Sequence, residues 1–273
     1  MGCEMSHIDK IKTDISELSR QCAIMERAGA SFGVPEIRGA HDRIIQILDY
    51  YSTTYTLNDF LRIPGVPRLR ERLLEANVKV HMRSEVESAA VAISKDGDPF
   101  DSSWINPGFY ELLLGQVERW RLLGIPKSGD RRPLVIVGGG ALPQSQVLLH
   151  RQTGRAIISL DKDAESVYAA RRVIRHLGYS SKLKVVQQDG MLYDYGEASL
   201  VVIAGLVLCK YEIAARVFHT APSIFLNVRT PTGVHGMWRV PVDPDGLRSI
   251  GWNIVDTWTP QNSAISSLTC INA

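Results

Sequence analysis

The chain has 273 residues, of which 45% are hydrophobic and 22% are charged, and its formal net charge is +2. These values are ordinary for a soluble globular protein with one large domain or two small ones, and they give no electrostatic argument for a nucleic-acid partner. No apolar run reaches the length of a membrane span, and residues 1–30 are charged and amphipathic, unlike a secretory signal.

The cysteines and histidines give no sign of a metal site. The four cysteines, Cys3, Cys22, Cys209 and Cys270, are widely spaced, and no pair has the spacing of a metal site or a redox motif. The seven histidines also lack a ligand pattern. The sequence therefore predicts reduced thiols, a cytoplasmic protein and no bound metal.

Helical periodicity dominates the chain as far as a turn-rich stretch at residues 124–130. Apolar residues recur at three- and four-residue steps within 8–18, 44–51 and 112–120, which is the pattern of amphipathic helices. We therefore predict an all-α domain over residues 1–127, with five to seven helices. Loops are expected near residues 29–39, 64–67 and 97–107.

The most informative stretch begins at residue 134. An apolar run, 134–137, ends in the three glycines 138–140, and about 20 residues further on a second apolar run ends in Asp161. A nucleoside cofactor needs this order of strand, tight turn, helix, strand and carboxylate, because the backbone must approach closely and ribose hydroxyls need an acceptor. Pro143 occupies the third glycine position of the dinucleotide fingerprint, which favours S-adenosylmethionine over NAD.

Strand and helix patterns alternate after the turn-rich stretch, as in an α/β protein. Two later strand-like runs, 237–242 and 252–258, flank an Asp-Pro-Asp-Gly sequence and suggest an antiparallel pair that closes a mostly parallel sheet. We therefore predict a class I methyltransferase-like Rossmann domain over residues 128–273. Its other strands are expected at 133–138, 156–161, 183–187, 199–204 and 223–229, and its helices at 143–153, 163–177 and 208–220.

Acidic and small residues after the predicted strands complete the candidate cofactor site. Asp161 either accepts hydrogen bonds from ribose or caps the helix that begins near Asp163, and Asp189 either faces the adenine amino group or is a plain turn residue. Ala204 and Gly205 either admit a substrate to the sulfonium or allow close helix packing. The residues predicted to contact the cofactor are Gly138, Gly139, Gly140, Leu142, Pro143, Asp161, Lys162, Asp189, Gly190, Ala204 and Gly205.

Two carboxylates in the helical half, Glu85 and Glu87, lie next to an apolar run. Residues two apart on a helix point to different faces, so one carboxylate can be solvated while the other faces inward. An inward carboxylate is partly desolvated, which raises its pKa toward the range that a general base needs. The same pattern is also typical of two surface acids, and the residues alone leave both interpretations open.

Several motifs resemble those of one enzyme family. Residues 137–143, 159–164 and 170–173 look like the cofactor half of nicotianamine synthases. They look equally like bacterial histidine aminobutanoyltransferases, which make opine metallophores such as staphylopine and pseudopaline. Residues 226–233 and 238–241 resemble the family's fifth strand and the segment after it.

The resemblance implies an unusual use of S-adenosylmethionine. It implies that the amine of an amino-acid acceptor attacks the γ-carbon of the methionyl chain, so that the aminobutanoyl group is transferred and methylthioadenosine is released. Glu87 is the better match to the family's catalytic glutamate, and Tyr110, at the end of segment 104–110, is the best counterpart of its tyrosine. By this resemblance Glu87 takes the proton of the acceptor ammonium, Tyr110 assists, and the helical half forms a lid.

Three other functions remain open from the sequence. S-adenosylmethionine can cyclise through its own amine to azetidine-2-carboxylate, or donate its methyl group to a small molecule. A non-catalytic S-adenosylmethionine-binding protein is a different class, although such a module needs no buried base. The sequence does not identify the acceptor, which is histidine-like or glutamate-like in the leading interpretation, and a homodimer is compatible with it.

Overall fold

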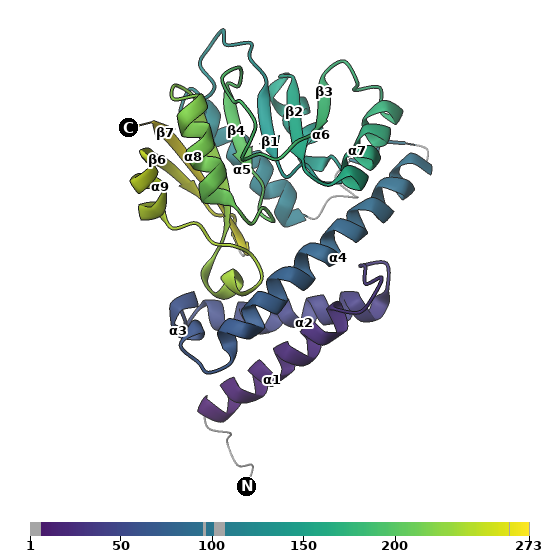
Figure 1. Ribbon diagram of the computed structural model, residues 1–273, viewed down its shortest axis with the longest axis vertical. Coiled ribbons are helices and arrows are strands. Elements are labelled where there is room, and N and C mark those ends of the chain that lie inside the picture. Colours follow the sequence, from purple (N-terminus) through teal and green to yellow (C-terminus); the bar gives the residue numbers. More distant parts are fainter. Residues whose placement is uncertain (1–6, 95–96, 101–106, 262, 273) are drawn as a thin grey trace. The chain divides into compact units, whose positions relative to one another are not determined.

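The computed structural model describes residues 7–94, 97–100, 107–261 and 263–272 (Figure 1). The chain forms two compact units. The helical unit contains Met1–Ser84 and Thr232–Arg239, and the sheet unit contains Glu85–Pro231 and Val240–Ala273. The division therefore falls at residue 84 and not at 127, because residues after Ser84, such as Ala89 and Trp120, share an apolar core with the sheet.

The helical unit has the amphipathic helices that the sequence predicts. Ile44, Leu48 and Tyr51 are buried in one core together with Leu18. Pro35 begins the second helix, since proline suits the first helical position, and this shortens the loop expected at 29–39. The elements of this unit are α1 (His7–Met25), α2 (Pro35–Ser52), α3 (Leu57–Leu61), α4 (Val66–Ser94) as far as Ser84, and the short 3-10 helix η1 (Gly233–Met237).

The sheet unit contains a seven-stranded sheet in the order β3-β2-β1-β4-β5-β7-β6. The five strands β1 to β5 are parallel, and β7 runs antiparallel to both β5 and β6. The order reverses between β1 and β4, and ligands of open α/β sheets bind at such a point, beyond the carboxyl ends of the strands. The strands are β1 (Leu134–Val137), β2 (Ile157–Asp161), β3 (Leu183–Gln187), β4 (Leu200–Ile203), β5 (Phe225–Pro231), β6 (Trp252–Trp258) and β7 (Ile265–Asn272).

Alternate residues of the central strands enter two different cores. Leu134 and Ile136 of β1 belong to one core, and Val135 and Val137 belong to the other, so both faces of this strand are buried. The first core contains residues of α5 (Pro107–Leu122), α6 (Gln144–Thr153) and α7 (Ala164–His176), and the second contains residues of α8 (Lys210–Thr220) and α9 (Pro244–Ile250). This two-faced burial explains the continuous apolar runs that made the parallel strands predictable.

The tail of the chain differs from the prediction. Residues 237–242 form no strand, because Met237 and Trp238 are buried in the core of the helical unit. Asp243 accepts a hydrogen bond as the N-cap of α9 and Pro244 follows at its start, so the Asp-Pro-Asp-Gly sequence begins a helix and is no hairpin turn. The antiparallel partner of β6 is β7, which the sequence analysis missed.

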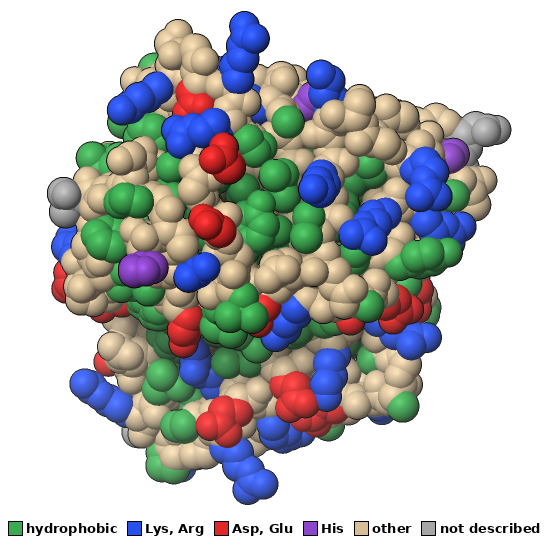
Figure 2. All heavy atoms as spheres, turned by 45° about the horizontal axis from the view of Figure 1, so that its top comes forward, with side chains coloured by type: hydrophobic (Ala, Val, Ile, Leu, Met, Phe, Trp, Pro, Cys, Tyr) green, Lys and Arg blue, Asp and Glu red, His purple; other side chains and the backbone are tan. Residues whose placement is uncertain are grey.

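Acidic and basic side chains are interspersed on the face of the molecule shown in Figure 2. This mixture agrees with the small net charge of +2. None of the described helices is both long and apolar enough to cross a membrane.

Candidate active site

The turn after β1 requires glycine at two positions. Gly138 and Gly140 have φ angles of 78° and 68°, a region that side chains strongly disfavour. A Cβ atom at Gly138 would lie 2.5 Å from the Val207 side chain. The backbone N–H groups of Gly138 and Gly139 both donate to the Leu160 carbonyl, at 2.9 and 3.0 Å, which fixes the turn against the end of β2.

Asp161 lies at the end of β2, beside this turn. Its Oδ2 accepts a hydrogen bond from Gly140 N at 2.9 Å, and its Oδ1 accepts one from Asp163 N at 3.0 Å. The N-cap of α7 is Asp163, whose side chain accepts from Ser166 N, so Asp161 is not the capping residue. Each carboxylate oxygen has two lone pairs, and Asp161 therefore keeps acceptor capacity for ribose hydroxyls.

The other predicted contact residues follow β3 and β4. Asp189 Oδ1 accepts from Met191 N at 2.8 Å, so Asp189 does shape a turn, whichever group it also faces. Gly190 is buried, and a Cβ atom there would lie 2.6 Å from the Val137 side chain. Ala204 N donates to the Val137 carbonyl, which joins the two strands at the switch point. Of the remaining predicted residues, Pro143 is buried, Leu142 and Gly205 are half-buried, and Lys162 is exposed.

The carboxylate that reaches the glycine turn is Glu85, whereas the family resemblance implied Glu87 as the catalytic glutamate. Glu85 Oε2 accepts a hydrogen bond from Ala141 N at 3.0 Å, and a Cβ atom at Gly140 would collide with this carboxylate. Burial raises the pKa of Glu85 to about 7, against the opposing effect of the N–H groups of Ala141 and Leu142. The nearby charge of Asp161 raises this pKa further.

The phase of α4 explains this difference. Ala89 and Ala92 lie four and seven residues after Glu85, on the same helix face, and both are buried in the core that the sheet shares. Both glutamates are half-buried, but Glu87 lies two residues further along and therefore on a different face. Ala89 and Ala92 are therefore the sequence feature that identifies Glu85 as the carboxylate on the buried face.

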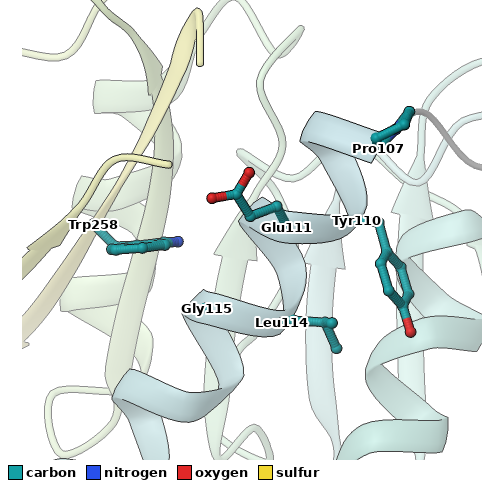
Figure 3. Close-up of a pocket in the computed structure, with 6 residues that line it drawn as sticks. All are labelled: Pro107, Tyr110, Glu111, Leu114, Gly115 and Trp258. Atoms are coloured by element: carbon teal, nitrogen blue, oxygen red, sulfur yellow. The ribbon is translucent and has the colours of Figure 1, made fainter. Parts of the chain in front are cut away.

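Tyr110 lies in α5 and packs against the same apolar core as Val86 and Leu142, the neighbours of Glu85 and Ala141 in sequence. It also lines a cavity of about 500 Å³. Residues 104–106 of the predicted tyrosine segment lie outside the described residues. The lining residues are Pro107, Tyr110, Glu111, Leu114, Gly115 and Trp258 (Figure 3).

Trp258 and Gly115 form one wall of this cavity. A Cβ atom at Gly115 would collide with the Trp258 indole, so only glycine allows the ring to approach α5 this closely. The carboxylate of Glu111 extends toward the side on which Trp258 lies (Figure 3). Arg119 forms a two-pronged ion pair with Asp256, at 2.5 and 2.6 Å, and joins α5 to β6 one helical turn further on.

Arg229 is a buried cation that the sequence analysis did not include in the site. Its guanidinium donates to Ser145 Oγ at 3.0 Å and to Gln116 Oε1 at 3.4 Å, and lies 5.3 Å from the Phe109 ring centre. Its Nε has no hydrogen-bond partner within the described part of the chain, and burial lowers the pKa of Arg229 to about 10. An arginine within a strand whose residues are nearly all buried was the signal for this residue.

The position of Arg229 links it to the carboxyl edge of the sheet. It follows Val228, which pairs with Ile203, the last residue of β4, so it lies beyond the end of that strand. Ser145 belongs to the first turn of α6, which begins directly after the glycine turn. A buried cation that pairs with no acid in the described ranges can hold a carboxylate here.

Curated proteins match part of the chain. An L-histidine 2-aminobutanoyltransferase of Pseudomonas aeruginosa is 29% identical over 123 residues, which cover 44% of this chain and 46% of that protein. Nicotianamine synthase 9 of Hordeum vulgare is 24% identical over 219 residues, which cover 75% of this chain and 63% of that protein. The predicted resemblance to these two kinds of enzyme is confirmed. The matches span from 46% to 63% of the relatives' own length, and no protein-family model matches the chain.

Solved structures with the same fold cover both units. The crystal structure of MtNAS in complex with MTA and tNA has a TM-score of 0.75 at 20% identity, and the comparison covers 100% of both chains. A mutant of MtNAS in complex with S-adenosylmethionine has a TM-score of 0.74 at 19% identity, covering 94% of this chain and 97% of that chain. With the strand order described above, these likenesses confirm the predicted fold class.

Proposed function

We propose that the chain transfers the 3-amino-3-carboxypropyl (aminobutanoyl) group of S-adenosylmethionine to the amine of an amino-acid acceptor and releases methylthioadenosine. The observation that carries this proposal is the Glu85 carboxylate, which accepts a hydrogen bond from the backbone next to the glycine turn and has its pKa raised to about 7. A module that only bound a nucleoside would gain nothing from a buried acid there, because its burial costs free energy. The likeness to an aminobutanoyltransferase and to nicotianamine synthases supports the same conclusion.

The residues at the carboxyl edge of the sheet fit S-adenosylmethionine. Residues 138–140 offer a glycine backbone that a nucleoside can approach, and Asp161 has lone pairs left for ribose hydroxyls. Asp189 and Gly190 would lie beside the adenine. Bound S-adenosylmethionine supplies an electrophilic γ-carbon next to its sulfonium, and the small residues after β4, Ala204 and Gly205, would leave room there. Leu142, Pro143 and Lys162 complete the proposed contact set.

Arg229 would bind the carboxylate of the methionyl chain. Its planar guanidinium matches a carboxylate, and a ligand anion would compensate a cation that has no acidic partner among the described residues. Such an ion pair would fix the methionyl chain at its far end and so hold the γ-carbon in one place.

Glu85 would take the proton from the acceptor ammonium. The amine must be neutral to attack carbon, and a carboxylate whose pKa is about 7 is a stronger base than an ordinary glutamate while still being largely ionised just above neutrality. Glu85 therefore replaces Glu87 as our candidate base. Tyr110 remains the candidate that orients the amine or relays the proton, since it packs against the same apolar core as Val86, the sequence neighbour of Glu85.

Product analysis of the purified protein tests the proposal. The protein is incubated with S-adenosylmethionine and a panel of amino acids that includes L-histidine and L-glutamate, and nucleosides and adducts are identified by mass spectrometry. We expect methylthioadenosine together with an acceptor enlarged by one aminobutanoyl group. Stoichiometric S-adenosylhomocysteine would instead make the chain a methyltransferase, and azetidine-2-carboxylate formed without an acceptor would make it a cyclase.

Three finer statements belong to the same proposal. The product is a precursor of an opine-type metallophore, which the histidine acceptor in the name of the Pseudomonas relative supports. The protein is cytoplasmic, which the free thiols of Cys22, Cys209 and Cys270 support, because thiols persist in reducing compartments. A homodimer is compatible with the sequence, and light scattering after size-exclusion chromatography would test for it.

A further inference from the structure

The helical unit contains a cluster of basic and aromatic side chains that the proposed chemistry does not use. The rings contact one another edge to face or tilted: Phe32 lies 4.6 Å from His41 and 4.9 Å from His81, and His41 lies 4.9 Å from Trp238, between ring centres. The Arg239 guanidinium carbon lies 5.9 Å from the Trp238 ring centre. We call the following residues the basic cluster: Phe32, His41, His81, His235, Trp238 and Arg239.

The basic cluster has unsatisfied polar atoms. In the part of the chain that the structure describes, five buried nitrogens of the cluster have no hydrogen-bond partner: His41 Nε2, His81 Nε2, His235 Nδ1, Trp238 Nε1 and Arg239 Nε. Buried polar atoms in folded proteins are nearly always hydrogen-bonded, and each exception needs an explanation. A single exception can be a site for one water molecule, whereas several on side chains in mutual contact indicate a ligand.

The ligand atom that these side chains fit is a hydrogen-bond acceptor with negative charge. Arg239 Nε and Trp238 Nε1 are donors only, so they need an acceptor opposite them. Burial lowers the pKa values of Arg239, His41 and His81, and the nearby charge of Arg239 lowers those of the two histidines further. A bound anion would compensate Arg239 and favour protonated histidines, which donate from both ring nitrogens.

The acidic residues near the cluster do not fill this role. Asp42 contacts Nδ1 of His41 at 3.5 Å, and Asp49 contacts Nε2 of His235 at 2.9 Å. In both His41 and His235, one ring nitrogen contacts the aspartate and the other ring nitrogen is the unsatisfied one. Arg239 has no ion pair with any described acid, in contrast to Arg72 of the same unit, which pairs with Glu26 at 2.6 Å.

We propose that the basic cluster binds a carboxylate group of the acceptor amino acid. This inference rests on the proposed function and names the part of the chain that recognises the second substrate. The planar guanidinium of Arg239 would pair with the two carboxylate oxygens, with Trp238 Nε1 as an additional donor. The rings of Phe32 and Trp238 would provide apolar contact for the rest of the acceptor.

A chemical double-mutant cycle tests the proposal. Binding of L-histidine and of L-histidinamide, in which a neutral amide replaces the carboxylate, is measured by calorimetry with the wild-type protein and with Arg239→Gln, at a pH at which both α-amines are protonated. If L-glutamate proves the faster acceptor, its two mono-amides replace histidinamide. We expect the wild-type protein to prefer the acid by about 10- to 100-fold, as charge-assisted hydrogen bonds typically give, and the variant to bind acid and amide equally.

Arg70→Gln is the matched control. Arg70 lies in the same unit and is also partly buried, but its Nε already donates to the Gly236 carbonyl at 2.9 Å. This variant should keep the wild-type preference for the acid. If Arg239→Gln fails to fold, Trp238→Phe keeps the ring and removes one donor, and it should reduce the preference by several-fold.

The outcomes separate this proposal from the proposed function. An unchanged acid-to-amide ratio in both Arg239→Gln and Trp238→Phe, or no preference for the acid in the wild-type protein, would overturn the carboxylate site. Absence of methylthioadenosine in the wild-type reaction would overturn the proposed function, while the calorimetric ratio would still report on the cluster.

Discussion

Glu85 is the residue on which the proposed proton transfer depends. Glu85→Gln keeps an oxygen that can accept the Ala141 N–H but removes the base, so we expect turnover to fall by about 10²–10⁴-fold. In the wild-type protein, kcat/KM should rise with pH through an apparent pKa near 7, since only the ionised carboxylate accepts a proton. Steady-state release of methylthioadenosine between pH 5.5 and 8.5 measures both effects.

Glu87→Gln serves as the control for this experiment. Glu87 lies on a different face of α4, so the variant should turn over at close to the wild-type rate with the same pH profile. An inactive Glu87→Gln beside an active Glu85→Gln would return the role of base to Glu87. If both variants stay active, neither carboxylate is the base.

Asp161 should determine affinity for S-adenosylmethionine. Asp161→Ala removes the acceptor for ribose and also that of Gly140 N, so the affinity should fall by about 1–3 kcal/mol in a calorimetric titration. Asp163→Ala is the matched control, because it removes the N-cap of α7 two residues away and should lower stability by about 1 kcal/mol with little effect on affinity. Equal affinities of wild-type protein and Asp161→Ala would contradict the ribose contact.

The sequence located the glycine turn and Asp161 because these features are local: a strand, a turn and an acid follow one another along the chain. It did not distinguish Glu85 from Glu87, since that choice depends on which face of α4 is buried. The face is set by packing against the sheet, which no local pattern around residue 87 reveals. Arg229 was missed for a similar reason, because only the fold shows that no described acid pairs with it.

The glycine turn and α4 form one element pair whose packing can be tested. Gly140→Ala places a Cβ atom in the left-handed region and against the Glu85 carboxylate, whereas Gly154→Ala has the same φ angle of 68° and nothing within 4 Å. We expect Gly154→Ala to cost about 1–2 kcal/mol from backbone strain alone. Gly140→Ala should lower the free energy of unfolding, measured in urea, by more than Gly154→Ala does. It should also weaken S-adenosylmethionine binding. Equal losses of stability in the two variants would show that steric contact with Glu85 does not restrict residue 140.

Among the elements, the parallel strands were predicted because burial on both faces gives continuous apolar runs. The strand β7 was missed because its buried positions include Ser267 and Thr269, which bond to Asn227 on the neighbouring strand. Polar residues at buried strand positions interrupt the apolar pattern that predicts a strand, so this segment was not recognised in the sequence. Residues 237–242 produced the opposite error, since Met237 and Trp238 are buried in the helical core and Val242 in a core of the sheet unit, without forming a strand.

For the whole molecule, Glu85 links stability to pH. Its pKa is raised from 4.5 to about 7, so the folded protein retains a proton that the unfolded chain has released between these values. The contribution to the free energy of unfolding is therefore largest below pH 4.5 and is lost as pH rises through 7, by roughly 1–3 kcal/mol. Urea unfolding at pH 5 and pH 8 should show that Glu85→Gln loses less stability than the wild-type protein. Other titrating groups are common to both proteins, and equal losses would mean that Glu85 titrates normally.

The composition of the helical unit has a consequence for synthesis on the ribosome. Val234, Met237 and Trp238 are almost fully buried in the core of α1 to α4, but they are translated only after β5. At typical elongation rates the first helices leave the ribosome on the order of 10 s before the residues that complete their core. During that interval the core of the helices lacks these three side chains, so we expect the helical unit to complete its folding only after residue 238 has emerged.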